Sequence, residues 1–153
     1  MTDYVSENMS RKVIFCTGED NLRSAYQIMQ SNQIRHIPVI DGDELVGVLS
    51  SKDIYISAQM GEDGELIVPN VNVKEAMTRQ PITCDAKTKI SDVARIMVRR
   101  KIDCLPVIGK QGHLVGMITS SDLLELLEEE EDQFFGARII PFNYELIRAH
   151  LAQ

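Results

Sequence analysis

Apolar residues recur at helical spacing in two well-separated segments of the chain. In the first segment, Leu22, Ala25, Ile28 and Met29 are spaced as residues on one face of a helix are. The second segment repeats this spacing with Ile90, Val93, Ala94, Ile96 and Met97. The pattern predicts two amphipathic helices, each with one buried face.

Each predicted helix is followed by two short apolar runs that a turn separates. Residues 37–40 and 45–49 flank a turn at residues 41–43, which contains Asp, Gly and Asp. Residues 105–108 and 114–118 repeat the arrangement. Short apolar runs on either side of turn-forming residues are typical of a β-hairpin.

A further strand and a further helix complete each set of elements. A hydroxyl residue follows each hairpin at the expected N-cap of a helix, with Asp53 or Asp122 in the first turn, where a carboxylate is favoured. First strands are expected around residues 13–16 and 82–84. The predicted order is strand, helix, strand, strand, helix, an α+β fold in which helices cover one side of each sheet.

The two halves of the chain are copies of one sequence. A shift of 68 residues places Val39 on Val107, and one extra residue in the second copy makes the shift 69 from Leu45 and Leu114 onward. The first shift aligns Val5 with Val73, Glu7 with Glu75, Met9 with Met77, Arg11 with Arg79, Ile14 with Ile82 and Cys16 with Cys84. So many identities in register indicate an internal duplication.

The repeat divides the chain into four parts. The first copy spans residues 5–60 and the second spans residues 73–128. Residues 61–72 contain two glycines, a proline and several acids, a composition that predicts an exposed linker. Residues 129–153 combine an acidic stretch with an apolar tail, for which three roles stay open: closing a cleft, stabilising a dimer or docking on a partner protein.

Length and charge narrow the class of protein. Two domains in 153 residues must pack against each other, because a domain below about 70 residues rarely buries enough apolar surface alone. The net charge of −7 argues against a nucleic-acid partner, which needs clustered Lys and Arg. The start shows no signal pattern and no apolar run approaches the roughly 18 residues of a membrane span, so we expect a cytoplasmic protein without a membrane partner.

The cysteines and histidines give little support for metal binding. Cys16, Cys84 and Cys104 lie far apart, without the spacing of a zinc site, and are expected to be reduced thiols in a core. The three histidines are equally scattered. We therefore expect no metal site.

One motif occurs at matched positions in both copies. Residues 47–53 and 116–122 both have the form Gly, two apolar residues, Ser or Thr, two more residues, Asp. The glycine allows another backbone or a ligand to come close. A hydroxyl and a carboxylate at a helix start could bind the paired hydroxyls of a ribose. The alternative is that Ser50 and Thr119 cap a helix while Asp53 and Asp122 support its dipole.

A second motif lies where the helix leads into the strand. Arg35 and His36 precede the strand of the first copy, and Asp103 and Cys104 occupy the same positions in the second. The planar guanidinium of an arginine suits a phosphate, although a surface ion pair and a half-buried histidine are the alternative. The proline that follows in each copy predicts a strand start or an edge strand.

Both copies resemble cystathionine-β-synthase-type (CBS) domains, which occur in tandem as Bateman modules. The resemblance rests on the Pro-Val-Ile strand and the Gly-to-Asp motif, which occur twice in the same order, and it covers residues 5 to about 128. It implies two β-α-β-β-α domains that pack through their sheets as a pseudo-two-fold pair with two related clefts. It also implies a regulatory protein that binds AMP, ADP, ATP or S-adenosylmethionine, with a role in energy sensing.

The resemblance also assigns roles to residues. Ser50 with Asp53, and Thr119 with Asp122, would hold ribose hydroxyls. Arg35 and His36 would face phosphates, and Arg79 is a further phosphate candidate. The adenine pocket and its apolar walls would be lined by Val13, Ile14, Pro81, Ile82, Ile34 and Ile102.

Two function classes follow, and an enzyme is the weakest alternative. The leading hypothesis is an adenosyl-ligand sensor, without a catalytic cofactor, that signals through the packing of a homodimer. The other is a ligand-independent interaction module that holds an unidentified protein target. No catalytic triad, carboxylate pair or phosphate loop can be assembled from the chain, so no catalytic residue is predicted. Because Asp103 and Cys104 replace Arg35 and His36, the first cleft is expected to favour a phosphate.

Overall fold

The computed structural model describes residues 4–131, and within them the two copies fold in the same order. The first part of the chain forms α1 (Val5–Asn8), α2 (Leu22–Asn32), β1 (His36–Asp41), β2 (Glu44–Ser50), α3 (Ser51–Ser57), β3 (Gln59–Met60) and β4 (Leu66–Ile67). The second part forms the 3₁₀ helix η1 (Val73–Glu75), β5 (Thr78–Arg79), β6 (Cys84–Asp85), α4 (Ile90–Arg100), β7 (Cys104–Ile108), the 3₁₀ helix η2 (Lys110–Gly112), β8 (Leu114–Thr119) and α5 (Ser120–Glu131).

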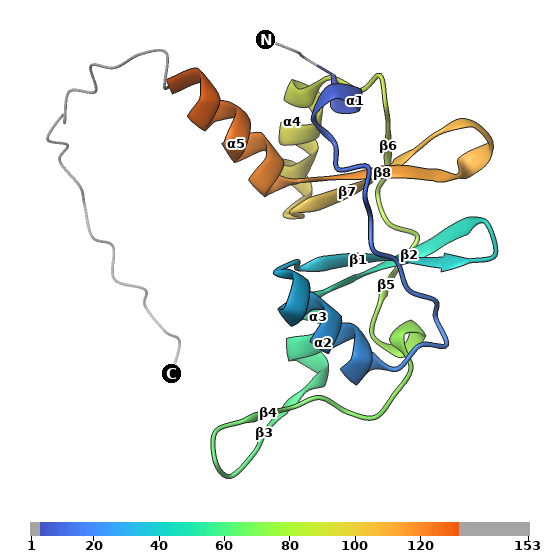
Figure 1. Ribbon diagram of the computed structural model, residues 1–153, viewed down its shortest axis with the longest axis vertical. Helices are drawn as coiled ribbons and strands as arrows, with labels where there is room; N and C mark the ends of the chain where they lie inside the picture. The colour runs from blue at the N-terminus through green and yellow to red at the C-terminus, as the bar shows by residue number, and fades with distance from the viewer. Residues whose placement is uncertain (1–3, 132–153) are drawn as a thin grey trace, which may run out of the picture.

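Two three-stranded sheets face each other, and the helices lie on their outer sides (Figure 1). One sheet has the strand order β1-β2-β5 and the other has the order β6-β7-β8. Both hairpins are antiparallel, and each carries a register shift at the matched position, after Val39 and after Val107. The predicted α+β pair that packs through its sheets is confirmed.

The predicted amphipathic helices are α2 and α4. Helix α2 is capped by Asn21, whose side chain accepts a hydrogen bond from the Arg23 amide at 2.9 Å. Both helices end on a residue in the left-handed conformation, Gln33 with φ 53° and Lys101 with φ 56°. Their apolar faces are buried in two separate cores, one in each half of the molecule.

The start of each copy packs into the core of the other copy. Val5 and Met9 belong to the core that contains Leu105, whereas Val73 belongs to the core that contains Leu22. The strand pairing follows the same exchange, because β5 pairs with β2 and an isolated bridge joins the segment after α1 to β8. Neither core is complete without the other copy, so the two domains form one folding unit.

The glycine of the Gly-to-Asp motif makes this exchange possible. A Cβ on Gly47 would lie 2.8 Å from the Thr78 carbonyl oxygen, and a Cβ on Gly116 would lie 2.9 Å from the Ser10 carbonyl oxygen. Both distances are shorter than a real side chain tolerates. The glycine therefore admits a neighbouring backbone, one of the two possibilities that the sequence left open.

The predicted first strands are shorter than expected. Residues 13–15 form no strand, and in this segment Cys16 alone pairs, through a parallel bridge to Val39. In the second copy the strand is β6, which starts at Cys84 rather than at Ile82. The reason is that residues 12–14 and 80–82 cross the gap between the two sheets and line cavities there.

The expectation that proline marks a strand start or an edge is wrong for Pro106. This residue lies inside β7, which is the middle strand of its sheet. The missing amide costs no hydrogen bond there, because β6 pairs with β7 only at Val107 and Ile108. Pro38 lies inside β1, at the edge of its sheet.

Half of the residues in the segment between the copies, 61–72, are exposed, and the segment contains regular structure. Strands β3 and β4 pair as a short antiparallel hairpin. Val68 is buried in the first core, and the Arg23 guanidinium Nε donates a hydrogen bond of 2.7 Å to the Val68 carbonyl. These contacts tie the connection to the first domain.

Within residues 4–131, no helix is long and apolar enough to cross a membrane. The predicted apolar tail at residues 133–153 lies outside the described residues.

Replacing Gly47 with alanine should destabilise the protein by about 1–3 kcal/mol, because the new methyl group would collide with the β5 backbone. Urea unfolding followed by circular dichroism measures this. Gly42→Asn is the control, since Gly42 has φ 60° and open space around it, and asparagine tolerates that conformation. Equal stability of the two variants would contradict the exchanged strand pairing.

Candidate functional site

Two cavities lie between the facing sheets. The first has a volume of about 470 Å³ and the second of about 380 Å³. The first is lined by Arg35, His36, Val48, Ser50, Ser51, Lys52, Asp53, Ile56, Thr78, Gln80, Pro81, Ile82, Lys101, Ile102, Asp103 and Cys104. The second is lined by Ser10, Lys12, Val13, Ile14, Gln33, Ile34, Arg35, His36, Met117, Thr119, Ser121, Asp122 and Glu125.

Each cavity is built from both copies of the repeat. The first combines Ser50 and Asp53 of copy one with residues 80–82 and 101–104 of copy two. The second combines Thr119 and Asp122 with residues 12–14 and 33–36, which are the matching segments of copy one. The strand exchange explains this arrangement, because it carries the start of each copy over to the hairpin of the other.

Twelve of the thirteen residues predicted from sequence line these cavities. The first contains Ser50, Asp53, Pro81, Ile82 and Ile102, and the second contains Val13, Ile14, Ile34, Thr119 and Asp122. Arg35 and His36 line both. Arg79 is in neither lining; its Nη2 donates to the Lys74 carbonyl at 3.3 Å.

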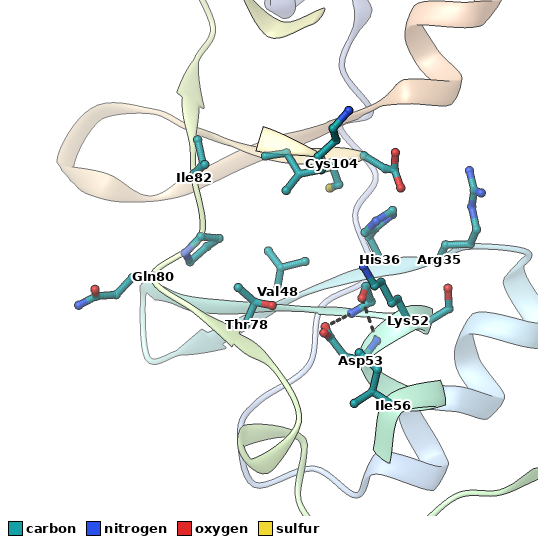
Figure 2. Close-up of a pocket in the computed structure, with 16 residues that line it drawn as sticks. Arg35, His36, Val48, Lys52, Asp53, Ile56, Thr78, Gln80, Ile82 and Cys104 are labelled. Atoms are coloured by element: carbon teal, nitrogen blue, oxygen red, sulfur yellow. Dashed lines mark hydrogen bonds between the residues drawn. The ribbon is translucent and has the colours of Figure 1, made fainter. Parts of the chain in front are cut away.

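The hydroxyl and carboxylate of each motif form a capping box at the start of α3 or α5. The Ser50 amide donates to Asp53 Oδ2 at 2.8 Å, and the Asp53 amide donates to Ser50 Oγ at 3.1 Å (Figure 2). Thr119 and Asp122 repeat this, at 2.7 Å and 3.4 Å. The helix cap considered from sequence is therefore present.

The cap leaves part of each carboxylate available to a ligand. Within residues 4–131, Oδ1 of Asp53 and Oδ1 of Asp122 accept no hydrogen bond. The cap holds the other oxygen and fixes the side chain at the cavity wall. Each motif can therefore cap its helix and present an acceptor to a hydroxyl group at the same time.

Arg35 connects the edges of the two cavities. Its carbonyl oxygen accepts a hydrogen bond from the Ser51 amide at 2.9 Å, at the start of α3. Its Nη2 donates to Ser121 Oγ at 3.3 Å, in the first turn of α5. In Figure 2 the side chain lies at the margin of the first cavity, with its guanidinium pointing away from Asp53.

His36 is a neutral, half-buried side chain between the two cavities. Burial lowers its pKa below the usual value for histidine. The carboxylates of Asp103 and Asp53 act in the opposite direction, and the Arg35 guanidinium adds to the lowering. At neutral pH the imidazole therefore offers one donor and one acceptor, without a charge.

Cys104 occupies the position in copy two that His36 occupies in copy one. Burial, followed by the charge of Asp122, raises the pKa of its thiol to about 12. The thiol is therefore protonated and unreactive at neutral pH. All three cysteines are free, as expected from sequence.

Three lysines in the linings were not singled out from sequence. Lys52 and Lys101 line the first cavity, and Lys12 lines the second. Each is adjacent in sequence to a predicted site residue: Asp53, Ile102 and Val13, respectively. A search for cations next to the motif residues would have found them.

The two cavities differ in their charged side chains. The first has cations at Arg35, Lys52 and Lys101 and carboxylates at Asp53 and Asp103. In the second, cations and carboxylates are equal in number, and Glu125 stands where the first cavity has Ile56. Within residues 4–131, no three His, Cys, Asp or Glu side chains gather as metal ligands would.

Comparison with known proteins identifies both halves of the chain. The family model described as CBS domain matches residues 2–57 and 73–129. An inosine-5′-monophosphate dehydrogenase of Korarchaeum cryptofilum is 34% identical over 140 residues, covering 87% of this chain and 28% of that enzyme. The chain therefore spans little more than a quarter of this relative.

Solved structures show the same architecture. The CBS domain pair of protein MJ0100, in complex with 5′-methylthioadenosine and S-adenosyl-L-methionine, has a TM-score of 0.72 and 26% sequence identity, covering 83% of this chain and 97% of that one. The AMP complex of CBSX2 has a TM-score of 0.74, covers 85% of this chain and 99% of that one, and at 21% identity shows the fold alone.

Proposed function

The chain belongs to the CBS domain family, as a tandem pair, and from this premise we propose that it is a regulatory module that binds an adenosyl ligand in the cavities between its sheets. The observation that carries the proposal is the construction of each cavity, where an acceptor-bearing carboxylate of one copy faces apolar walls of the other and cations stand in the same lining. The MJ0100 pair, which holds two adenosyl compounds, supports it.

The first cavity offers a complementary group for each part of an adenine nucleotide. Oδ1 of Asp53 would accept from a ribose hydroxyl, and Pro81, Ile82 and Ile102 would enclose the adenine. Lys52 and Lys101 would face the phosphates. A volume of about 470 Å³ is within the range of roughly 300–1,000 Å³ that is usual for small-molecule sites.

The second cavity would hold the same nucleoside part in the same way. Oδ1 of Asp122 takes the place of Oδ1 of Asp53, and Val13, Ile14 and Ile34 form the apolar walls. Lys12 and Arg35 are the cations available to a phosphate. AMP, ADP, ATP and S-adenosylmethionine are the ligands we propose; a nucleotide would make the protein a sensor of cellular energy.

Binding would act on the packing of the two copies. A ligand that contacts the motif of one copy and the strand start of the other joins both sheets, so its binding energy favours one relative arrangement of the domains. The chain corresponds to the CBS part of its enzyme relative, so the role we propose for it is regulatory, with no catalytic cofactor.

The helices that start at the cavities also suggest a homodimer. Tyr55 and Ile56 of α3 and Leu124 and Leu127 of α5 are large apolar side chains, each more than half exposed. Both helices begin on the same side of the pair (Figure 1). Exposed apolar residues in such number are typical of an interaction surface, for a second copy or, as the alternative function, for a protein target held without a ligand.

Binding is tested by calorimetry with AMP, ADP, ATP and S-adenosylmethionine. Asp53→Asn and Asp122→Asn each keep an oxygen for the helix cap but remove the charge, and each should weaken one site at least tenfold, because a charged hydrogen bond contributes roughly 1.5–3 kcal/mol. Asp43→Asn, in an exposed turn, is the control. Absence of binding by all four ligands would refute the proposal.

Dimerisation is tested by sedimentation velocity. Leu124→Glu should convert a dimer into a monomer, because the carboxylate cannot be buried in an apolar interface without a partner. Val98→Glu is the matched control, since Val98 is an equally exposed apolar residue on α4. A monomeric unmodified protein, or equal behaviour of the two variants, would contradict the proposed interface.

A further inference from the structure

The two cavities share two side chains. Among the described residues that line them, Arg35 and His36 are the two present in both. Every other lining residue belongs to one cavity, as expected for sites related by a pseudo-two-fold axis. The shared pair breaks this symmetry, because Asp103 and Cys104, which hold the matching positions, line only the first cavity.

The Arg35 guanidinium is held weakly where it lies. Its hydrogen bond to the neutral Ser121 hydroxyl is 3.3 Å long and exposed. Within residues 4–131, Arg35 forms no ion pair. Its main chain, in contrast, is fixed at the start of α3 by the hydrogen bond from Ser51. Because the backbone is fixed and the guanidinium is exposed and weakly bonded, the side chain can turn toward an anion in either cavity.

Lys52 and Lys101 line only the first cavity and Lys12 only the second, and copy two has no cation at the position that matches Arg35. The carboxylate of Asp103 stands at the matching position, and it would repel an anion. His36 is neutral at ordinary pH because burial lowers its pKa. Two anionic ligands would therefore compete for one guanidinium.

We propose that Arg35 couples the two cavities, so that an anionic ligand in one lowers the affinity of the other for a second anion. The inference rests on the proposed function and extends it to regulation between the sites. The coupling is reciprocal, because thermodynamic linkage requires a ligand in either cavity to change the affinity of the other cavity by the same factor. A neutral nucleoside does not attract the guanidinium, so adenosine binding is uncoupled.

Calorimetry with AMP and with adenosine tests the coupling in the full chain. The affinity of the cavity that fills last is measured twice. In the unmodified protein, the second binding step gives this affinity while the other cavity is filled. In Asp53→Asn or Asp122→Asn, the other cavity is disabled, so the same affinity is measured with that cavity empty. For AMP, the affinity with the neighbour filled should be at least about fivefold weaker, which is the lower end of usual coupling factors. For adenosine, the two affinities should agree.

The role of Arg35 is tested by repeating both measurements in two further backgrounds. Arg35→Gln should make the two AMP affinities agree. Lys52→Gln is the matched control, because Lys52 lines only the first cavity. It should weaken AMP binding there and leave the coupling in place.

Three outcomes would overturn the inference while leaving the proposed function intact: equal AMP affinities in the unmodified protein, a difference that persists in Arg35→Gln, or AMP binding at a single cavity in every variant. If neither adenosine nor AMP binds at all, the proposed function fails and the coupling fails with it.

Discussion

The structure depends on one backbone pairing that occurs twice. The segment that starts each copy crosses to the hairpin of the other copy, where Gly47 and Gly116 let it approach closely. This pairing completes both cores, because Val5 and Val73 are buried in the opposite domain. It also creates the cavities, because residues 12–14 and 80–82, which follow the pairing, lie between the two sheets and line the cavities. A single domain would have neither a complete core nor a complete site.

The duplicated scaffold carries two different cavities. Both cavities have a capping box, apolar walls and a neighbouring motif glycine, and we propose that these features position a nucleoside. The side chains around them differ at matched positions, with Ile56 against Glu125, Lys52 against Ser121, Arg35 against Asp103 and His36 against Cys104. The fold therefore fixes where a ligand would lie, and these substitutions determine which charge it would carry.

Local features of the fold could be predicted from sequence, and non-local ones could not. The helices, hairpins and caps follow from spacing and turn residues within about a dozen positions, as Leu22 to Met29 or Ser50 to Asp53 illustrate. The partner of a short segment such as residues 12–16 depends on pairing far along the chain, which no local pattern encodes. From sequence, Arg35 was therefore expected at the first of two inter-domain clefts, whereas the structure places Arg35 in both linings.

We propose that each cavity is one ligand site made by both copies. A crystal structure of the full chain with AMP tests it most directly. We expect a ribose bound to Asp53 with its adenine against Pro81 and Ile82, and at the second site a ribose bound to Asp122 with its adenine against Val13 and Ile14. An AMP held by residues of a single copy, or bound outside both cavities, would contradict it.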